Sequence, residues 1–403
     1  MTADPTLSSR LIDQQARYGA AHERPADLVC TRADGAYVWD VQGARYLDFQ
    51  SGGGAVAQGH NHTRIAAAMV EQCLRLCLAS RTLRHDRLPP LLEKLCTLTG
   101  FERALLMSSG TEAVETAIMA VRRWGYQRKG IPPGRAGIIA FSGNWHGHST
   151  TVAGMGGRPE STMDFGPFTP GFQIVPYGSL AAVREAAGPE TCGVLVEPVQ
   201  GEAGVVVPPK GFLRGLREFC DSRHIMLIAD EIDSGLGRTG KLFAFEHEGI
   251  RPDGVTLGKA LSGGFYPVSA LLGSHELMSV FTPGSHGSTY GGSPLACAVA
   301  SAALDVLVDE KLVDRSAELG AYLLERLRAM EASRVKEIRG LGLWAGVELR
   351  PDAGGALPAC AALRREGLLC AAAGEHTLRL SPPLVITREQ LDWALEKLKL
   401  ILS

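Results

Sequence analysis

Residues 256–264 read Thr256-Leu257-Gly258-Lys259-Ala260-Leu261-Ser262-Gly263-Gly264, a single lysine between a short apolar run and a turn of small residues. Another apolar run, residues 225–229, ends in Asp230 and Glu231. Short apolar runs of this kind are typical of strands buried on both faces of a parallel sheet. Ligands of α/β proteins bind at the carboxyl edge of such a sheet. We therefore predict that Lys259 and Asp230 belong to one site.

The strand pattern recurs over the middle of the chain. Six short apolar runs alternate there with helical segments, at 104–107, 137–141, 193–196, 225–229, 254–257 and 267–272. This alternation predicts an α/β domain with a mostly parallel sheet flanked by helices.

A different pattern follows Gly292. Helices are expected at 293–309, 312–330, 359–366 and 388–402, and strands at 335–338, 343–349 and 377–381. We interpret this region as a smaller α+β domain, completed by an N-terminal segment in which residues 37–49 predict a hairpin. The expected division is residues 1–50 for the N-terminal segment, 51–300 for the large domain and 301–403 for the small domain.

Composition excludes several classes of function. A chain of 403 residues exceeds the size of one hydrophobic core, and its formal charge of −2 gives no reason to expect a nucleic-acid or membrane partner. No apolar run approaches the roughly 18 residues that a membrane helix requires. The nine cysteines show no CxxC spacing, and the first 20 residues lack an apolar signal core. We expect a cytoplasmic protein without disulfides or a zinc site.

The lysine and the aspartate suggest a particular chemistry. A lysine amine can bind an aldehyde covalently as a Schiff base, and an aspartate can pair with a pyridinium nitrogen. Together they are what a pyridoxal 5′-phosphate (PLP) enzyme requires. Taken alone, Lys259 is more simply read as a surface residue after a strand.

Polar loops follow the other predicted strands. Ser109, Gly110 and Thr111 precede a helix whose first N–H groups can bind a phosphate, although the same residues also match a capping box. Trp145 and His146 follow the next strand, where the indole can stack on a ligand or lie buried in the core. Ser288 and Thr289 offer hydroxyl groups before a later helix. His146 and His148 lack further ligands at metal-binding spacing, so we expect no metal.

The chain resembles the class III (ornithine-type) aminotransferases of PLP fold type I along nearly its whole length. The matching stretches are 39–40, 58–60, 109–113, 196–198, 201–206, 230–232, 237–240, 258–264, 266–270 and 381–384. The resemblance implies a large domain with a seven-stranded sheet, a smaller domain, and a homodimer with shared active sites.

The resemblance also implies roles for individual residues. Lys259 would bind PLP and carry a proton, and Asp230 would hold the pyridine nitrogen protonated. Ser109, Gly110 and Thr111 would bind the phosphate, and Thr289, beside Ser288, would reach it from the neighbouring subunit. Trp145, beside His146, would stack on the ring where the family usually has Phe or Tyr.

Several positions depart from the family pattern. The two tyrosines and the arginine that hold the ornithine carboxylate correspond to Glu23, Gly53 and His148. A neutral histidine cannot replace the two-pronged hydrogen bonding of a guanidinium. Asp233 stands where the family usually has a glutamine that donates to the 3′-oxygen of PLP. An aspartate there must either raise the pKa of the bound cofactor or be protonated itself.

Another carboxylate-binding pair is retained. Arg379 matches the arginine that binds glutamate or 2-oxoglutarate, and Glu202 matches the residue that neutralises it. Our leading hypothesis is transamination between glutamate or 2-oxoglutarate and a bulky amine without a carboxylate, such as an amino sugar of an aminoglycoside-type pathway. Ornithine or another ω-amino acid is the alternative. A PLP-dependent epimerase or eliminase, or a non-catalytic descendant, are further alternatives.

Overall fold

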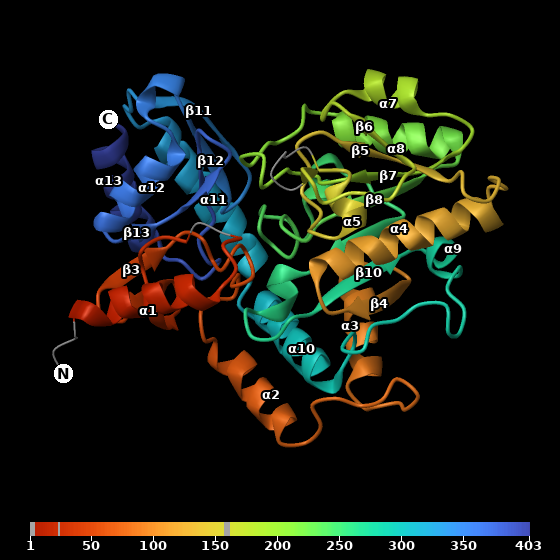
Figure 1. The fold of residues 1–403 in the computed structure, drawn as a ribbon, viewed down its shortest axis with the longest axis horizontal. Helices are drawn as coiled ribbons and strands as arrows, with labels where there is room; N and C mark the ends of the chain where they lie inside the picture. The colour runs from red at the N-terminus through yellow and green to blue at the C-terminus, as the bar shows by residue number, and fades with distance from the viewer. Residues whose placement is uncertain (1–4, 23–24, 157–161) are drawn as a thin grey trace.

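Three β-sheets organise the fold. The structure is a computed structural model that describes residues 5–22, 25–156 and 162–403. One sheet has seven strands and the other two have four strands each. The large sheet and its helices lie on one side of the molecule, and the two smaller sheets lie on the other (Figure 1).

The seven-stranded sheet has the order β4-β10-β9-β8-β7-β5-β6. Strand β10 is antiparallel to both of its neighbours, and the remaining pairs are parallel. The strands are β4 (Arg103–Met107), β5 (Gly137–Phe141), β6 (Phe172–Val175), β7 (Thr191–Val196), β8 (Met226–Asp230), β9 (Gly254–Leu257) and β10 (Ser269–Gly273). The predicted mostly parallel, seven-stranded α/β domain is therefore confirmed.

Successive side chains of a strand point to opposite faces of the sheet, and both faces of this sheet are apolar. Helices therefore cover both of them. Ile138 packs in the core that contains Val121 of α4 (Gly110–Gln127), whereas its neighbour Ile139 packs with Leu216 of α8 (Phe212–Arg223). Figure 1 shows α4 crossing one face of the sheet. The other elements of this region are α3 (Leu88–Thr99), α5 (Thr150–Ala153), α7 (Leu180–Ala186), α9 (His275–Met278) and the 3-10 turns η1 (Ala244–Glu248) and η2 (Lys259–Ser262).

The smaller sheets combine both ends of the chain. The predicted hairpin at 37–49 is confirmed, since β2 and β3 pair antiparallel, and β3 also pairs in parallel with β13. One sheet contains β1 (Cys30–Asp34), β2 (Tyr37–Asp40), β3 (Arg45–Asp48) and β13 (Leu368–Leu369). The other contains β11 (Val335–Gly340), β12 (Ala345–Leu349), β15 (Thr377–Leu380) and β14 (Ala371–Ala373).

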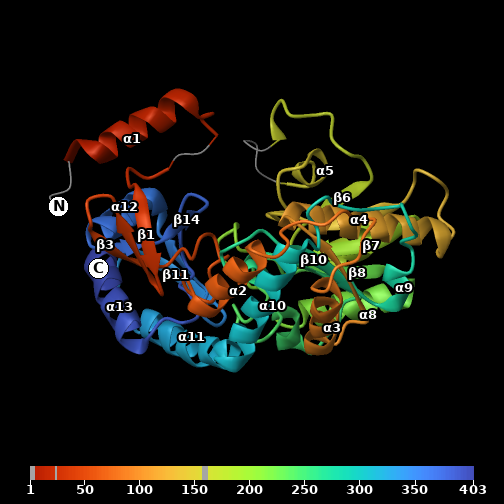
Figure 2. The ribbon, with the colours of Figure 1, turned by 90° about the horizontal axis from the view of Figure 1, so that it is seen from below.

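Long helices surround these sheets and connect them to the large one. Helices α11, α12 and α13 lie beside the smaller sheets, and α10 lies between the two parts (Figures 1 and 2). One hydrophobic core runs continuously from Leu47 through Leu257 to Leu402, so the domain boundaries near residues 50 and 300 stay a proposal. These helices are α1 (Pro5–Tyr18), α2 (Thr63–Cys73), α10 (Pro294–Asp309), α11 (Leu312–Arg328), α12 (Ala356–Arg365) and α13 (Arg388–Leu402), with the 3-10 turn η3 (Pro351–Ala353). Across the described ranges, every helix is too short or too polar to cross a membrane.

Candidate active site

A cavity of about 230 Å³ opens at the carboxyl edge of the large sheet. The loops that follow β4, β5, β7, β8 and β9 all contribute to its wall, as expected where parallel strands end together. The cavity is lined by Gly110, Thr111, Trp145, His146, Gly147, His148, Glu197, Asp230, Ile232, Asp233 and Lys259. Most of the predicted cofactor-binding residues therefore meet in one place.

Lys259 begins the turn η2 directly after β9 and Gly258. Its backbone φ of 38° is in the left-handed region, which a non-glycine residue rarely adopts and which often marks a functional site. The amine Nζ lies 2.6 Å from Oδ1 of Asp233. The lysine thus points into the cavity with a carboxylate as its ion-pair partner.

Asp230 ends β8 and is held rigidly by three hydrogen bonds. His146 Nδ1 lies 2.6 Å from Oδ2, while Thr256 Oγ1 and the Ile232 N–H donate to Oδ1 over 2.9 Å and 3.2 Å. The His146 ring is buried, and its Nε2 has no hydrogen-bond partner among the described residues. A carboxylate fixed in this way is suited to hold a positive charge on a ligand in the cavity.

The first turn of α4 forms another part of the wall. Ser109 is the N-cap: its Oγ accepts from the Glu112 N–H over 3.2 Å, and Glu112 Oε2 accepts from the Ser109 N–H over 3.0 Å. The predicted capping box is therefore present, while Gly110 and Thr111 face the cavity. The first N–H groups of a helix lack intrahelical partners and attract anions.

Glycine at position 147 allows two loops to approach closely. A Cβ on Gly147 would lie 2.1 Å from Oγ1 of Thr111, and the backbone φ of 117° is one that favours glycine. The 144–148 loop therefore packs directly on the first turn of α4.

These residues fit PLP. Lys259 can bind the aldehyde, Asp230 can hold the pyridine nitrogen, and the start of α4 can bind the phosphate. Trp145 supplies an aromatic ring in the same wall. The chemistry of this donor set matches the cofactor group by group, although the individual roles stay proposals.

Asp233 lies in a narrow slot. Cβ atoms placed on Gly54 and Gly201 would lie 3.2 Å from its Oδ1 and 2.8 Å from its Oδ2. Burial opposes ionisation, but Lys259 and Arg379 outweigh it and lower the pKa of Asp233 below the ordinary value. Of the two states predicted for this aspartate, the structure favours the ionised one.

Two buried glutamates lie near the same edge. Glu197, directly after β7, accepts the Trp145 N–H over 3.1 Å, and burial beside Asp230 raises its pKa well above the usual range. Burial also raises the pKa of Glu231 to about 7, although its carboxylate accepts from the Ser234 hydroxyl over 2.6 Å. The sequence places Glu197 directly after a strand, at the same sheet edge as Asp230, but it was assigned no role in the predicted site.

The pair predicted to bind the second substrate is present. Arg379 on β15 forms an ion pair with Glu202 in the loop after β7, and both side chains are largely buried. Arg379 Nε is buried and has no hydrogen-bond partner among the described residues. Arg379 also lowers the pKa of Asp233, so it acts electrostatically on a residue of the cavity wall.

The other three residues predicted to contact substrate differ in where they lie. His148 lies in the cavity wall, where its ring makes an edge contact with Trp145 at a centroid distance of 4.5 Å. A Cβ on Gly53 would have no atom within 4 Å, so this position is open. Glu23 lies outside the described residues.

The Ser288–Thr289 pair lies away from Lys259. Ser288 Oγ contacts Ser108 Oγ and Glu112 Oε1 over 3.3 Å and 3.1 Å. Thr289 lines a separate cavity of about 210 Å³, formed with residues 79–92 and 104–106. Within a single chain, Thr289 is therefore not in the wall of the candidate active site. Across the described part of the chain, no three His, Cys, Asp or Glu side chains gather where they could hold a metal ion.

The fold and the cavity define a PLP-dependent enzyme of fold type I. The chain belongs to the class III aminotransferases, because the family model "Aminotransferase class-III" matches residues 18–402. PLP is the cofactor of this family, and the expected class of enzyme is confirmed.

Several ornithine aminotransferases are similar to this chain along nearly its whole length. An ornithine aminotransferase of Bordetella pertussis is 52% identical over 99% of this chain and 96% of its own length. One from Brevibacillus brevis is 47% identical over 97% and 98% of the two chains. The solved ornithine aminotransferase of Toxoplasma gondii has a TM-score of 0.97 at 39% identity, covering 99% of this chain and 95% of its own.

The ionised Asp233 leads to a pH prediction. In the PLP-loaded protein, Asp233→Asn should lower the midpoint pH of the visible absorbance titration, because a negative charge that stabilises the protonated form is removed. The expected shift is about 1–3 pH units. The control Asp221→Asn, on the exposed face of α8, should leave the midpoint unchanged. An unchanged midpoint in Asp233→Asn would show that this carboxylate does not act on the cofactor.

Proposed function

We propose that this aminotransferase moves an amino group between ornithine and 2-oxoglutarate. The observation that carries the proposal is the 52% identity, over nearly full length, to a relative named ornithine aminotransferase. The relatives therefore favour the ornithine alternative over the amino sugar and offer no support for antibiotic biosynthesis. The amino-sugar hypothesis rested on missing carboxylate-binding residues, and such losses do not create contacts that recognise a sugar. The family match is to aminotransferases, so it does not favour an epimerase or eliminase.

Each group in the cavity has a proposed task. Bound PLP supplies an electron sink that makes a C–H bond next to nitrogen acidic. Lys259 provides the amine that holds the cofactor and moves the proton at its Nζ. Asp230, fixed by His146 and Thr256, keeps a positive charge on the pyridine nitrogen.

Substrate discrimination rests on the Arg379–Glu202 pair. Arg379 is proposed to bind the α-carboxylate of glutamate or 2-oxoglutarate once Glu202 moves aside. While Glu202 stays paired, Arg379 is neutralised, and ornithine can present its terminal amine. His148, in the wall of the cavity, is the proposed contact for the ornithine carboxylate.

We further propose a cytoplasmic homodimer. Exposed apolar side chains gather along residues 70–83 and at Tyr290, with Leu74 85% and Leu83 66% exposed. The two segments are joined by the Leu295 N–H donating to the Cys77 carbonyl over 3.4 Å and by Arg81 donating to the Ser288 carbonyl over 3.1 Å. A contiguous apolar surface of this kind is typical of an interface, and Thr289 lies beside it. A second subunit packed there would bring Thr289 near its partner's site.

The interface can be tested at Leu74. Leu74→Glu should convert the dimer to a folded monomer with little activity, because a charge would be buried at the centre of the contact. Sizing by light scattering and circular dichroism would report assembly and folding. The control Leu400→Glu, an equally apolar but separate exposed site on α13, should remain dimeric. A fully active monomer would contradict the shared site.

The substrate assignment can be tested by half-reactions. Ornithine should rapidly bleach the visible band of the PLP-loaded protein, whereas amino sugars should not. Arg379→Ala should slow the glutamate half-reaction about 30- to 4,000-fold, corresponding to ~2–5 kcal/mol for a lost buried charge contact, and spare the ornithine half-reaction. If amino sugars bleached the band rapidly and ornithine did not, the proposed function would be refuted and the amino-sugar hypothesis supported.

A further inference from the structure

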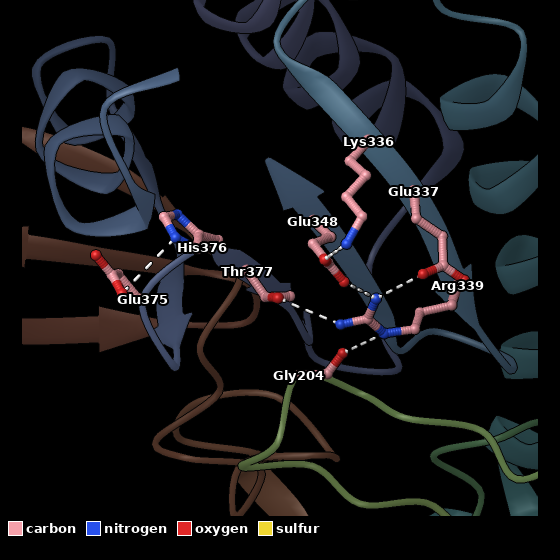
Figure 3. Close-up of polar contacts among 8 residues, drawn as sticks. All are labelled: Gly204, Lys336, Glu337, Arg339, Glu348, Glu375, His376 and Thr377. Carbon is pink, nitrogen blue, oxygen red and sulfur yellow. Dashed lines mark hydrogen bonds and ion pairs between the residues drawn. The ribbon is translucent and has the colours of Figure 1, made fainter. Parts of the chain in front are cut away.

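Arg339 lies at the centre of a polar cluster in the small domain (Figure 3). Its Nε donates to the Gly204 carbonyl over 2.8 Å, and Nη2 donates to Thr377 Oγ1 over 3.2 Å. Its Nη1 donates to Glu348 Oε2 over 2.5 Å. Gly204 is a residue of the large domain, in the same loop as Glu202. One partly buried guanidinium therefore joins the small domain to the loop that carries the acid of the substrate pair.

The sheet register places Arg339 beside Arg379. Arg339 on β11 pairs with Gly346 on β12, and Gly346 pairs with Arg379 on β15. The two arginines therefore flank a glycine in one row across the sheet. A Cβ on Gly346 would lie 2.4 Å from the Gly204 carbonyl oxygen, so the loop rests directly on this row.

The loop itself is tightly built. Gln200 and Val206 exchange two backbone hydrogen bonds of 3.0 Å and 2.9 Å at its base, and the Gly204 N–H donates to the Gly201 carbonyl over 3.0 Å. The φ of Gly204 is 108°, and a Cβ there would lie 2.8 Å from Nη2 of Arg339. Glu202 stands within this turn, on the side of Arg379.

We propose that Arg339 is a positioning residue for the substrate switch, holding the main chain of residues 201–205 against the small domain. The inference rests on the proposed function. Glu202 must pair with Arg379 for one substrate and leave it for the other. If the main chain is fixed at Gly204, Glu202 can leave Arg379 by rotation of its own side chain alone.

Loss of the contact between Arg339 and the Gly204 carbonyl should affect the half-reactions of the two substrates differently. A mobile loop lets Glu202 leave Arg379 even without glutamate, so the positive charge of the arginine is not neutralised by an ion pair when ornithine binds. Glutamate binding requires Glu202 to leave in any case. Arg339 contacts neither Lys259 nor Asp230, so a general loss of activity is not expected.

The test compares half-reactions of PLP-loaded Arg339→Gln and Lys336→Gln. Lys336 also pairs with Glu348, over 2.6 Å, but does not reach the loop, so it is a matched control. Arg339→Gln should slow the ornithine half-reaction about tenfold, or ~1.4 kcal/mol, and change the glutamate half-reaction by less than about threefold. Lys336→Gln should change each by less than about twofold, as for a surface ion pair. An equal slowing of both half-reactions by Arg339→Gln would overturn the proposal.

Coupling and exchange provide independent readouts. In a Glu202→Gln background, Arg339→Gln should no longer alter the ratio of the two half-reactions, because the acid through which it acts is gone. Amide hydrogen exchange in residues 201–206 should be faster in Arg339→Gln than in Lys336→Gln. Equal exchange rates in the two variants would show that Arg339 does not hold this loop in place. The exchange test requires no substrate. Inert ornithine in the unmodified protein would therefore refute the proposed function while exchange still decides the role of Arg339.

Discussion

The candidate active site depends on three neighbouring strands of the large sheet that end at the same edge. Strands β7, β8 and β9 are adjacent and parallel, so Glu197, Asp230 and Lys259 must emerge at one edge of the sheet. The edge is buried, and several carboxylates would be unstable there without compensation. Asp233 is compensated by its ion pair with Lys259, Asp230 by hydrogen bonds, and Glu197 by a raised pKa. The chemistry of the cavity follows from this arrangement, in which the single amine of Lys259 lies among several carboxyl groups.

In the proposed function, the small domain adds substrate selection to this chemistry. Arg379 and Arg339 lie in one cross-strand row, and both reach the loop after β7, one through the Glu202 carboxylate and the other through the Gly204 carbonyl. Glycine at 201, 204 and 346 lets the loop fit between the sheet and the cavity. The proposed catalytic groups thus come from the large sheet, while the groups proposed to distinguish substrates come from contacts between the two parts.

Much of this arrangement was predictable from local pattern. The six apolar runs correspond to six strands of the large sheet, and five of these strands are buried over all or nearly all of their length. Strand β6 was not predicted because it is a four-residue edge strand in which Gln173 interrupts the apolar residues. Strands β13 and β14 have only two and three residues, too few for any periodicity.

The site was predictable where a candidate residue lies at or close to the carboxyl end of a strand, as Asp230 and Lys259 do. The role proposed for Arg339 depends on sheet register and on a contact between residues 135 positions apart, which no local pattern contains. The ionisation of Asp233 depends on its distance to Lys259, and the identity of a substrate cannot be derived from the loss of residues at Gly53 and His148.

Lys259 is proposed to be the residue that binds PLP. This assignment can be tested by reducing the PLP-loaded protein with sodium borohydride, followed by digestion and mass spectrometry. The cofactor is expected to become fixed to the peptide that carries Lys259. Fixation on another lysine, with Lys259 unmodified, would contradict it.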